Sequence, residues 1–119
     1  MHGASPSTDQ PLYRYRFGAA DFDESRFELS VGGLVVEVQQ KPLQVLAALL
    51  HRPGEVLSRE ELLETVWADR VTVEQVLANA VAKLRRALGE SDGARIVTVP
   101  RSGYRFGKFR PVSCFATAR

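Results

Sequence analysis

The chain has 119 residues and a mass of 13.2 kDa, a size typical of one domain. Hydrophobic residues make up 45% and charged residues 25% of it, a globular balance that argues against a disordered or fibrous chain. A single cysteine, Cys114, excludes an internal disulfide, and no apolar run approaches the ~20 residues of a membrane-spanning helix. We therefore expect one cytoplasmic domain with no membrane segment.

The net charge of +2 conceals an asymmetry along the chain. Residues 1–70 hold 7 Lys and Arg against 11 Asp and Glu, whereas residues 71–119 hold 9 against 3. The basic C-terminal part suits a polyanionic partner such as nucleic acid. A solvated charged surface is the alternative interpretation, and the placement of the charges must decide between them.

The first predicted element is a small antiparallel sheet. Apolar and polar residues alternate along three segments, 13–17, 27–31 and 34–38. This period of two is typical of half-buried strands, and Gly32-Gly33 suits a tight turn between the last two. The apolar residues of the last segment are expected on the inner face of the sheet: Leu34, Val36 and Val38.

Two helices are predicted next. Pro42 suits a first helical position, and apolar residues recur at helical spacing until Pro53-Gly54 ends the first helix. His51, at the end of that helix, is expected to complement the helix dipole. Ser58 and Glu61 form a capping box that begins the second helix.

A third helix is predicted over residues 72–88. Thr72 and Gln75 repeat the capping pattern at its start, and Gly89 suits its C-terminal end. The rest of the pattern predicts a polar loop and a hairpin, with the loop at 90–94, strands at 95–99 and 104–109, and a turn at 100–103.

The polar face of the third helix carries the charge asymmetry. Its apolar residues fall within about 60° of one another on a helical wheel, and they are Leu77, Val81, Leu84 and Leu88. The opposite face offers amides, cations and one small side chain: Gln75, Asn79, Ala82, Lys83 and Arg86. Such groups suit base edges and phosphates in a major groove. An ordinary solvated helix face is the alternative.

The predicted hairpin adds a second basic element with Arg101 at its tip. Its cations alternate with aromatic residues, so the helix and the hairpin could follow the nucleic-acid backbone on either side of a groove. For Phe106 we favour simple packing onto the third helix. For Tyr104 packing and a hydroxyl that reaches a phosphate stay open as alternatives.

Several ordered motifs resemble one known family. They are the segment VLSREELL at 56–63 with Trp67, LRRALG at 84–89, IVTV at 96–99 and GYRF at 103–106. Together they resemble the OmpR/PhoB-type winged helix-turn-helix family, with features of its ToxR/CadC-like branch. The resemblance implies an α+β fold with an N-terminal antiparallel sheet, three helices and a C-terminal β-hairpin wing. It also implies sequence-specific binding of double-stranded DNA by a bacterial transcription regulator.

The resemblance also implies roles for individual residues. The third helix would enter the major groove through Gln75, Asn79, Ala82, Lys83 and Arg86. The wing would meet the backbone or the minor groove through Thr98, Arg101, Ser102 and Tyr104. Arg85 matches a backbone-contacting position, with a structural salt bridge as the alternative. The loop 67–71 matches a segment that some members present to RNA polymerase, although Trp67 is expected to anchor the core. Pairs of such domains commonly sit in tandem on DNA.

No catalytic or metal-binding apparatus is visible in the sequence. His2, His51 and Cys114 stand apart from other ligands, so we expect no enzyme, no cofactor and no metal site. The expected organisation is a mobile tail at 1–12, the winged-helix domain at 13–109 and a C-terminal tail or linker at 110–119. The competing function is a winged-helix module that binds an acidic protein partner, which would show an exposed apolar patch.

Overall fold

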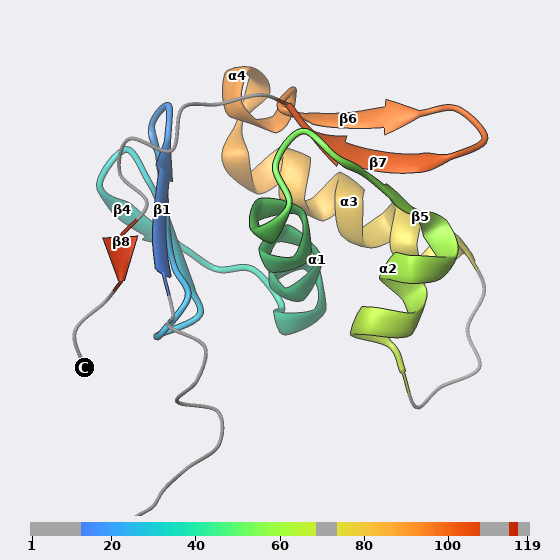
Figure 1. Ribbon diagram of the computed structural model, residues 1–119. Coiled ribbons are helices and arrows are strands. Elements are labelled where there is room, and N and C mark those ends of the chain that lie inside the picture. The colour runs from blue at the N-terminus through green and yellow to red at the C-terminus, as the bar shows by residue number, and fades with distance from the viewer. Residues whose placement is uncertain (1–12, 69–73, 108–114, 117–119) are drawn as a thin grey trace, which may run out of the picture.

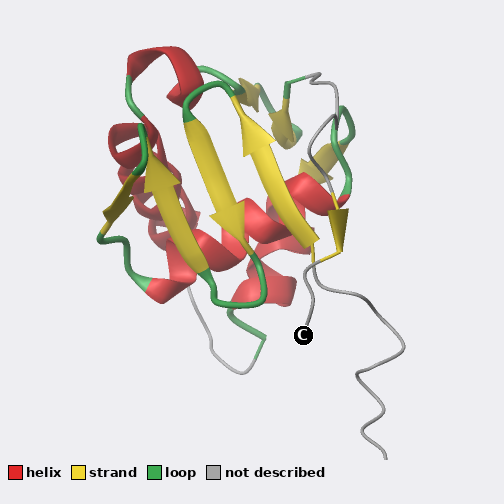
Figure 2. Cartoon of the chain, turned by 90° about the vertical axis from the view of Figure 1, so that its left-hand side faces the viewer, coloured by secondary structure: helices red, strands yellow, loops and turns green. Residues whose placement is uncertain are grey.

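The computed structural model describes residues 13–68, 74–107 and 115–116, and its helices pack between two antiparallel sheets (Figure 1). Five strands form the first sheet: β1 (Tyr13–Phe17), β2 (Ala20–Asp23), β3 (Glu28–Val31), β4 (Leu34–Val36) and β8 (Phe115–Ala116). Its strand order is β4-β3-β2-β1-β8, and one face lies against the helices (Figure 2). The second sheet has the order β5-β7-β6 and comprises β5 (Val56–Ser58), β6 (Ile96–Val99) and β7 (Gly103–Phe106).

The predicted N-terminal antiparallel sheet is confirmed, but its strands differ in number and bounds from the prediction. The sequence analysis missed β2, and it assigned Phe27 to a strand where the backbone instead turns with a φ of 55°. Leu34 was expected on the inner face, and this prediction was wrong, because its side chain is 73% exposed. The cause is that β4 has only three residues at the sheet edge, and Leu34 directly follows the turn, away from the core.

The first two helices follow the sequence prediction closely. Helix α1 (Gln40–His51) begins two residues before Pro42, so that proline occupies the third helical position instead of the first. This is still the first turn, where a backbone N–H has no helical partner. Helix α2 (Arg59–Val66) begins with the predicted capping box: the amide of Glu61 donates to Ser58 Oγ at 2.9 Å, and the Ser58 amide donates to Glu61 Oε1 at 3.3 Å.

Helix α3 (Glu74–Leu88) is the longest helix of the described residues. Its predicted apolar stripe is buried, and the helix ends before Gly89, whose positive φ of 92° is a conformation that glycine adopts without strain. The predicted cap Thr72 lies outside the described residues. A short helix, α4 (Glu90–Gly93), stands where a polar loop was predicted.

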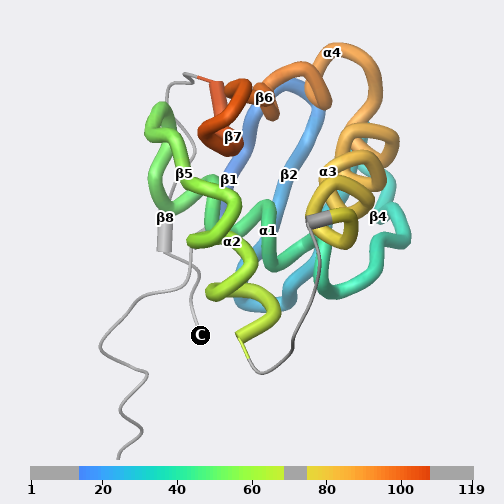
Figure 3. Tube along the Cα trace, turned by 90° about the vertical axis from the view of Figure 1, so that its right-hand side faces the viewer, coloured from blue at the N-terminus to red at the C-terminus, as the bar shows by residue number. Residues whose placement is uncertain are grey.

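The predicted wing is formed by β6 and β7, which pair in antiparallel register from Ile96–Phe106 to Val99–Gly103. The sequence analysis missed β5, the third strand, which pairs with β7 and precedes α2. Gly103 permits this pairing because a Cβ atom there would lie 2.0 Å from the carbonyl oxygen of Leu57. Helix α2, the start of α3 and the wing together form one end of the molecule (Figure 3).

A buried carboxylate joins the first sheet to the base of the wing. Asp92 in α4 is only 5% exposed, and its two oxygens accept from the Ala19 amide at 3.0 Å and from Arg95 Nε at 3.1 Å. Nearby, Phe17 of β1 packs edge-on against Phe106 of β7 with 5.0 Å between ring centroids. The two sheets therefore share one core with the helices.

The predicted tails lie largely outside the described residues. Residues 1–12, expected as a tail, lie outside the described residues. Within the segment expected as a C-terminal tail or linker, Phe115–Ala116 forms β8 and pairs with β1. No helix among the described ranges is both long enough and apolar enough to span a membrane.

Candidate nucleic-acid interface

The polar face of α3 is exposed along its length. All five residues predicted for this face are exposed in the structure: Gln75, Asn79, Ala82, Lys83 and Arg86. The opposite stripe is buried, and α3 packs against α1 and α2, because its leucine and valine side chains supply the core. The helical wheel therefore assigned the two faces of α3 as the structure has them.

The polar groups of this face have partners that can be exchanged for a ligand. Gln75 Nε2 donates to Asn79 Oδ1 at 3.2 Å, one helical turn apart. Lys83 Nζ donates to Gln39 Oε1 at 2.7 Å, and Gln39 is the residue that precedes α1. Both hydrogen bonds are exposed, and both acceptors are uncharged amide oxygens. Lys83 is therefore held in place without its charge being neutralised.

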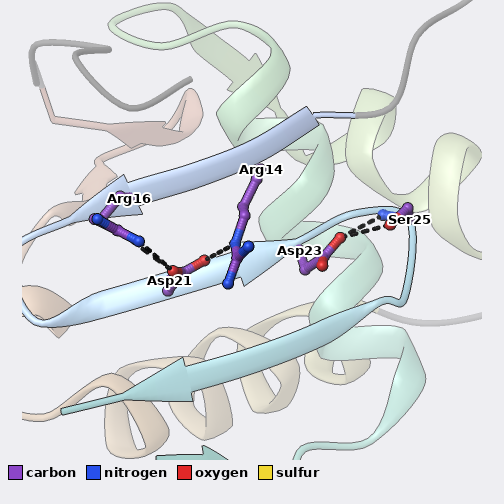
Figure 4. Close-up of polar contacts among 5 residues, drawn as sticks. All are labelled: Arg14, Arg16, Asp21, Asp23 and Ser25. Atoms are coloured by element: carbon purple, nitrogen blue, oxygen red, sulfur yellow. Dashed lines mark hydrogen bonds and ion pairs between the residues drawn. The ribbon is translucent and has the colours of Figure 1, made fainter. Parts of the chain in front are cut away.

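Several acidic residues of the N-terminal half are paired elsewhere. On the outer side of the first sheet, Asp21 accepts from Arg14 Nε at 3.0 Å and from Arg16 Nη2 at 3.2 Å (Figure 4). Beside them, Asp23 Oδ1 accepts from the hydroxyl of Ser25 at 2.7 Å (Figure 4). Among the described residues, no ion pair joins a carboxylate to Lys83, Arg86 or Arg101.

The tip of the wing is a tight turn that projects Arg101. The Ser102 amide donates to the carbonyl oxygen of Val99 at 3.0 Å, which closes a turn around Pro100 and Arg101. Arg101 has a φ of 68°, the left-handed conformation that the third residue of a type II turn requires. That position is usually filled by glycine, so a long cationic side chain here is uncommon. Residues 100–102 are exposed.

The aromatic residues predicted for the wing, Tyr104 and Phe106, are packed against the protein. Tyr104 is 7% exposed and pairs with Leu57 on one side and Thr98 on the other, so the packing interpretation describes its ring. Phe106 is fully buried, which confirms its packing role. Thr98 is exposed, and its hydroxyl accepts a hydrogen bond from Arg85.

Arg85 differs from its neighbour Arg86 in orientation. It lies on the flank of α3, is half-buried, and donates to the carbonyl oxygen of Ile96 through Nε at 3.1 Å and Nη2 at 2.6 Å. A structural salt bridge was the alternative expectation, and the actual partners are a carbonyl and a hydroxyl. Sequence reasoning could place Arg85 on the flank but could not identify these partners.

The remaining candidates have structural contacts. Trp67 is buried as the expected core anchor, and Lys41 Nζ lies 6.0 Å from its ring centroid while donating to the Val66 carbonyl at 2.7 Å. The rest of the loop 67–71, apart from Ala68, lies outside the described residues. His51 Nε2 lies 2.6 Å from Glu24 Oε2, and this hydrogen bond raises the pKa of His51. The sequence analysis expected only the helix dipole there and missed this partner, as it missed Asp92 and Gln39.

Known proteins are similar to this chain in sequence. The family model for "Transcriptional regulatory protein, C terminal" matches residues 33–106. The transcriptional regulatory protein CutR of Streptomyces coelicolor is 40% identical over 84 residues, which cover 70% of this chain and 38% of CutR. The transcriptional activator CadC of Escherichia coli is 30% identical over 81 residues, which cover 66% of this chain and 16% of CadC. The chain thus spans less than half the length of these relatives.

Solved structures show the same fold. The DNA-binding domain of E. coli CadC superimposes with a TM-score of 0.70 at 27% identity, covering 91% of this chain and 98% of that domain. The response regulator DrrB of Thermotoga maritima, described as an OmpR/PhoB homolog, gives a TM-score of 0.69 at 32% identity and covers 80% of this chain and 44% of DrrB. The described elements form the winged helix-turn-helix fold of these proteins.

Proposed function

Since this chain belongs to the C-terminal domain family of transcriptional regulatory proteins, of the OmpR/PhoB type, we propose that it binds double-stranded DNA sequence-specifically as part of a bacterial transcription regulator. Helix α3 enters the major groove, and the wing contacts the backbone or the adjacent minor groove. The observation that carries the proposal is the exposed face of α3, whose cations have no carboxylate partner in the described part of the chain. The family consists of DNA-binding regulators and is not an enzyme family.

The chemistry of the α3 face assigns different tasks to its residues. The amides of Gln75 and Asn79 can each donate and accept, so they can read a base edge once their mutual hydrogen bond opens. Lys83 exchanges its neutral partner Gln39 for a base or a phosphate. Arg86 contributes a second cation, and Ala82 lets the helix approach closely.

The wing supplies contacts that position the domain on DNA. Arg101 and Ser102 are the exposed polar residues of the tip, and both can bond to phosphate oxygens. Tyr104 is buried, so any contact from it is limited to its hydroxyl group, whereas Thr98 is exposed and its hydroxyl accepts from Arg85. We place the domain in the bacterial cytoplasm, where its DNA target is found.

Two further partners rest on the resemblance alone. A second copy on a repeated half-site would form a tandem pair, and RNA polymerase would meet the loop 67–71. The competing protein-binding module is favoured by one observation, namely that Leu34 and Val35 on β4 are exposed apolar residues. They lie on the first sheet, at the far end of the molecule from the wing tip (Figure 1). These two residues are therefore separate from the wing tip.

Selection of bound sequences from a random duplex pool at two salt concentrations tests the proposal. We expect an enriched sequence motif. We also expect the slope of log K against log salt concentration to be about −0.9 for each phosphate neutralised. Lys83→Ala and Asn79→Ala should relax the base preference, whereas Arg101→Ala should weaken all sequences about equally. Arg16→Ala is the matched control, since it removes an exposed cation from the first sheet and should leave binding unchanged. Unchanged affinity and preference in Lys83→Ala would refute this placement of α3.

A further inference from the structure

Arg85 connects the two elements proposed to contact DNA. Its guanidinium group donates to the Ile96 carbonyl oxygen through two nitrogens, at 3.1 and 2.6 Å, and to Thr98 Oγ1 at 2.9 Å. Ile96 and Thr98 lie two residues apart on β6, so their side chains point to the same face of the wing. One side chain of α3 therefore holds the first strand of the wing at two successive points.

Among the described residues, Arg85 makes all of the side-chain hydrogen bonds between α3 and β6. Strand β6 is an edge strand of the three-stranded sheet, and an edge strand presents backbone groups that no neighbouring strand satisfies. The planar guanidinium of Arg85 satisfies such a carbonyl with charge-assisted hydrogen bonds, which are stronger and more directional than neutral ones. A lysine ammonium cannot reproduce this fork, because it lacks the planar arrangement of donors.

We propose that Arg85 is a positioning residue, which fixes the orientation of the wing relative to α3 and does not itself contact DNA. This inference rests on the proposed DNA-binding function. Arg85 is half-buried, and its guanidinium donors bond to β6 within the protein. The adjacent Arg86 is exposed on the face proposed to enter the groove. A wing held in advance loses less freedom on binding, so Arg101 adds more to affinity than it would on a free wing.

The test compares Arg85→Lys with Arg16→Lys, two substitutions that keep the charge, the second at an exposed arginine of the first sheet. A lysine can still neutralise a phosphate, but it cannot reproduce the planar fork of donors. We expect Arg85→Lys to weaken binding to the selected duplex about tenfold, the loss expected for a charge-assisted hydrogen bond, and Arg16→Lys to stay near the wild type. Thr98→Val, which removes one acceptor of the fork, should weaken binding by a smaller factor.

A double-mutant cycle with Arg101→Ala identifies the route by which Arg85 acts. If Arg85 positions the wing, Arg101→Ala costs less affinity in the Arg85→Lys background than in the wild type, whereas it costs the same in the Arg16→Lys background. Wild-type affinity in Arg85→Lys, or full additivity with Arg101→Ala, would overturn the proposal.

Amide hydrogen exchange of the free protein provides a measurement that needs no DNA. We expect amides of β6 and β7 to exchange about tenfold faster in Arg85→Lys than in the wild type, while those of α1 stay unchanged. Unchanged exchange in the wing would overturn the positioning role even if DNA binding is confirmed. Conversely, faster exchange in a protein that selects no duplex sequence would support the hold on the wing and refute the proposed function.

Discussion

Replacing Arg101 by glycine should make the protein more stable and a weaker DNA binder. Arg101 has a φ of 68° at the exposed tip of the wing. A left-handed conformation costs an ordinary L-residue about 1–2 kcal/mol, and glycine avoids this cost. Glycine in turn costs about 0.5–1 kcal/mol through the larger freedom of the unfolded chain. The balance predicts a gain of about 0.5–1 kcal/mol in the free energy of unfolding.

The effect of Arg101→Gly on DNA binding has the opposite sign. The substitution removes a cation that has no carboxylate partner among the described residues, so one fewer phosphate is neutralised. The slope of log K against log salt should become shallower by about 0.9, and the affinity at low salt should fall. The arginine at this tip is thus expected to favour the complex while its left-handed backbone lowers the stability of the free domain.

Two assays measure the two effects on the same protein. Thermal unfolding should show a Tm that is higher by about 2–5 °C, and fluorescence anisotropy with the selected duplex over a salt series should show the shallower slope. Ser102→Gly is the control, because Ser102 is an uncharged neighbour with no positive φ. It should not raise the Tm and should keep the wild-type slope. A lower Tm in Arg101→Gly, or an unchanged slope, would refute the reasoning.

Three further predictions concern stability. Because Glu24 raises the pKa of His51, their contact stabilises the fold below the unfolded pKa of about 6.5, and this stabilisation is lost as the pH rises. His51→Gln should therefore lower the free energy of unfolding, measured in urea, by about 0.5 kcal/mol near pH 5 and should leave it unchanged near pH 9. Equal costs at both pH values would contradict this. Gly103→Ala places a Cβ 2.0 Å from the Leu57 carbonyl oxygen and should cost about 2–4 kcal/mol, so a calorimetric loss below about 1 kcal/mol would argue against the clash. Ser58→Ala removes the cap of α2 and should lower the free energy of unfolding by about 1 kcal/mol, and an unchanged denaturation midpoint would show that the cap is dispensable.

Features that depend on nearby residues were predictable from the sequence. The capping box of Ser58 and Glu61 needs only a spacing of three residues, and Gly89 needs only its place after a helix. The exposed face of α3 follows from the spacing of its apolar residues. These local signals, together with the resemblance, were sufficient for the fold class and for the elements that carry the candidate interface.

Features that depend on distant residues were not predictable. The exposure of Leu34 reflects the short edge strand β4, which the alternating pattern does not reveal. Asp92 occurs in a polar stretch, and only the folded chain brings the Ala19 amide to its carboxylate. The partners of Arg85 lie on a strand 11 to 13 residues away, and the acceptor of Lys83 lies 44 residues away. Sequence periodicity carries no information about such contacts.

The contacts of the Asp92 carboxylate determine the shortest segment that keeps this domain intact. The family match begins at residue 33, yet Ala19, which donates to Asp92, and Phe17, which packs on Phe106, both precede it. A fragment that begins at residue 33 would remove the Ala19 amide that donates to the buried Asp92 carboxylate. It would also expose the ring of Phe106, because Phe17 would be missing. A fusion of this domain to another protein should therefore place the junction before β1.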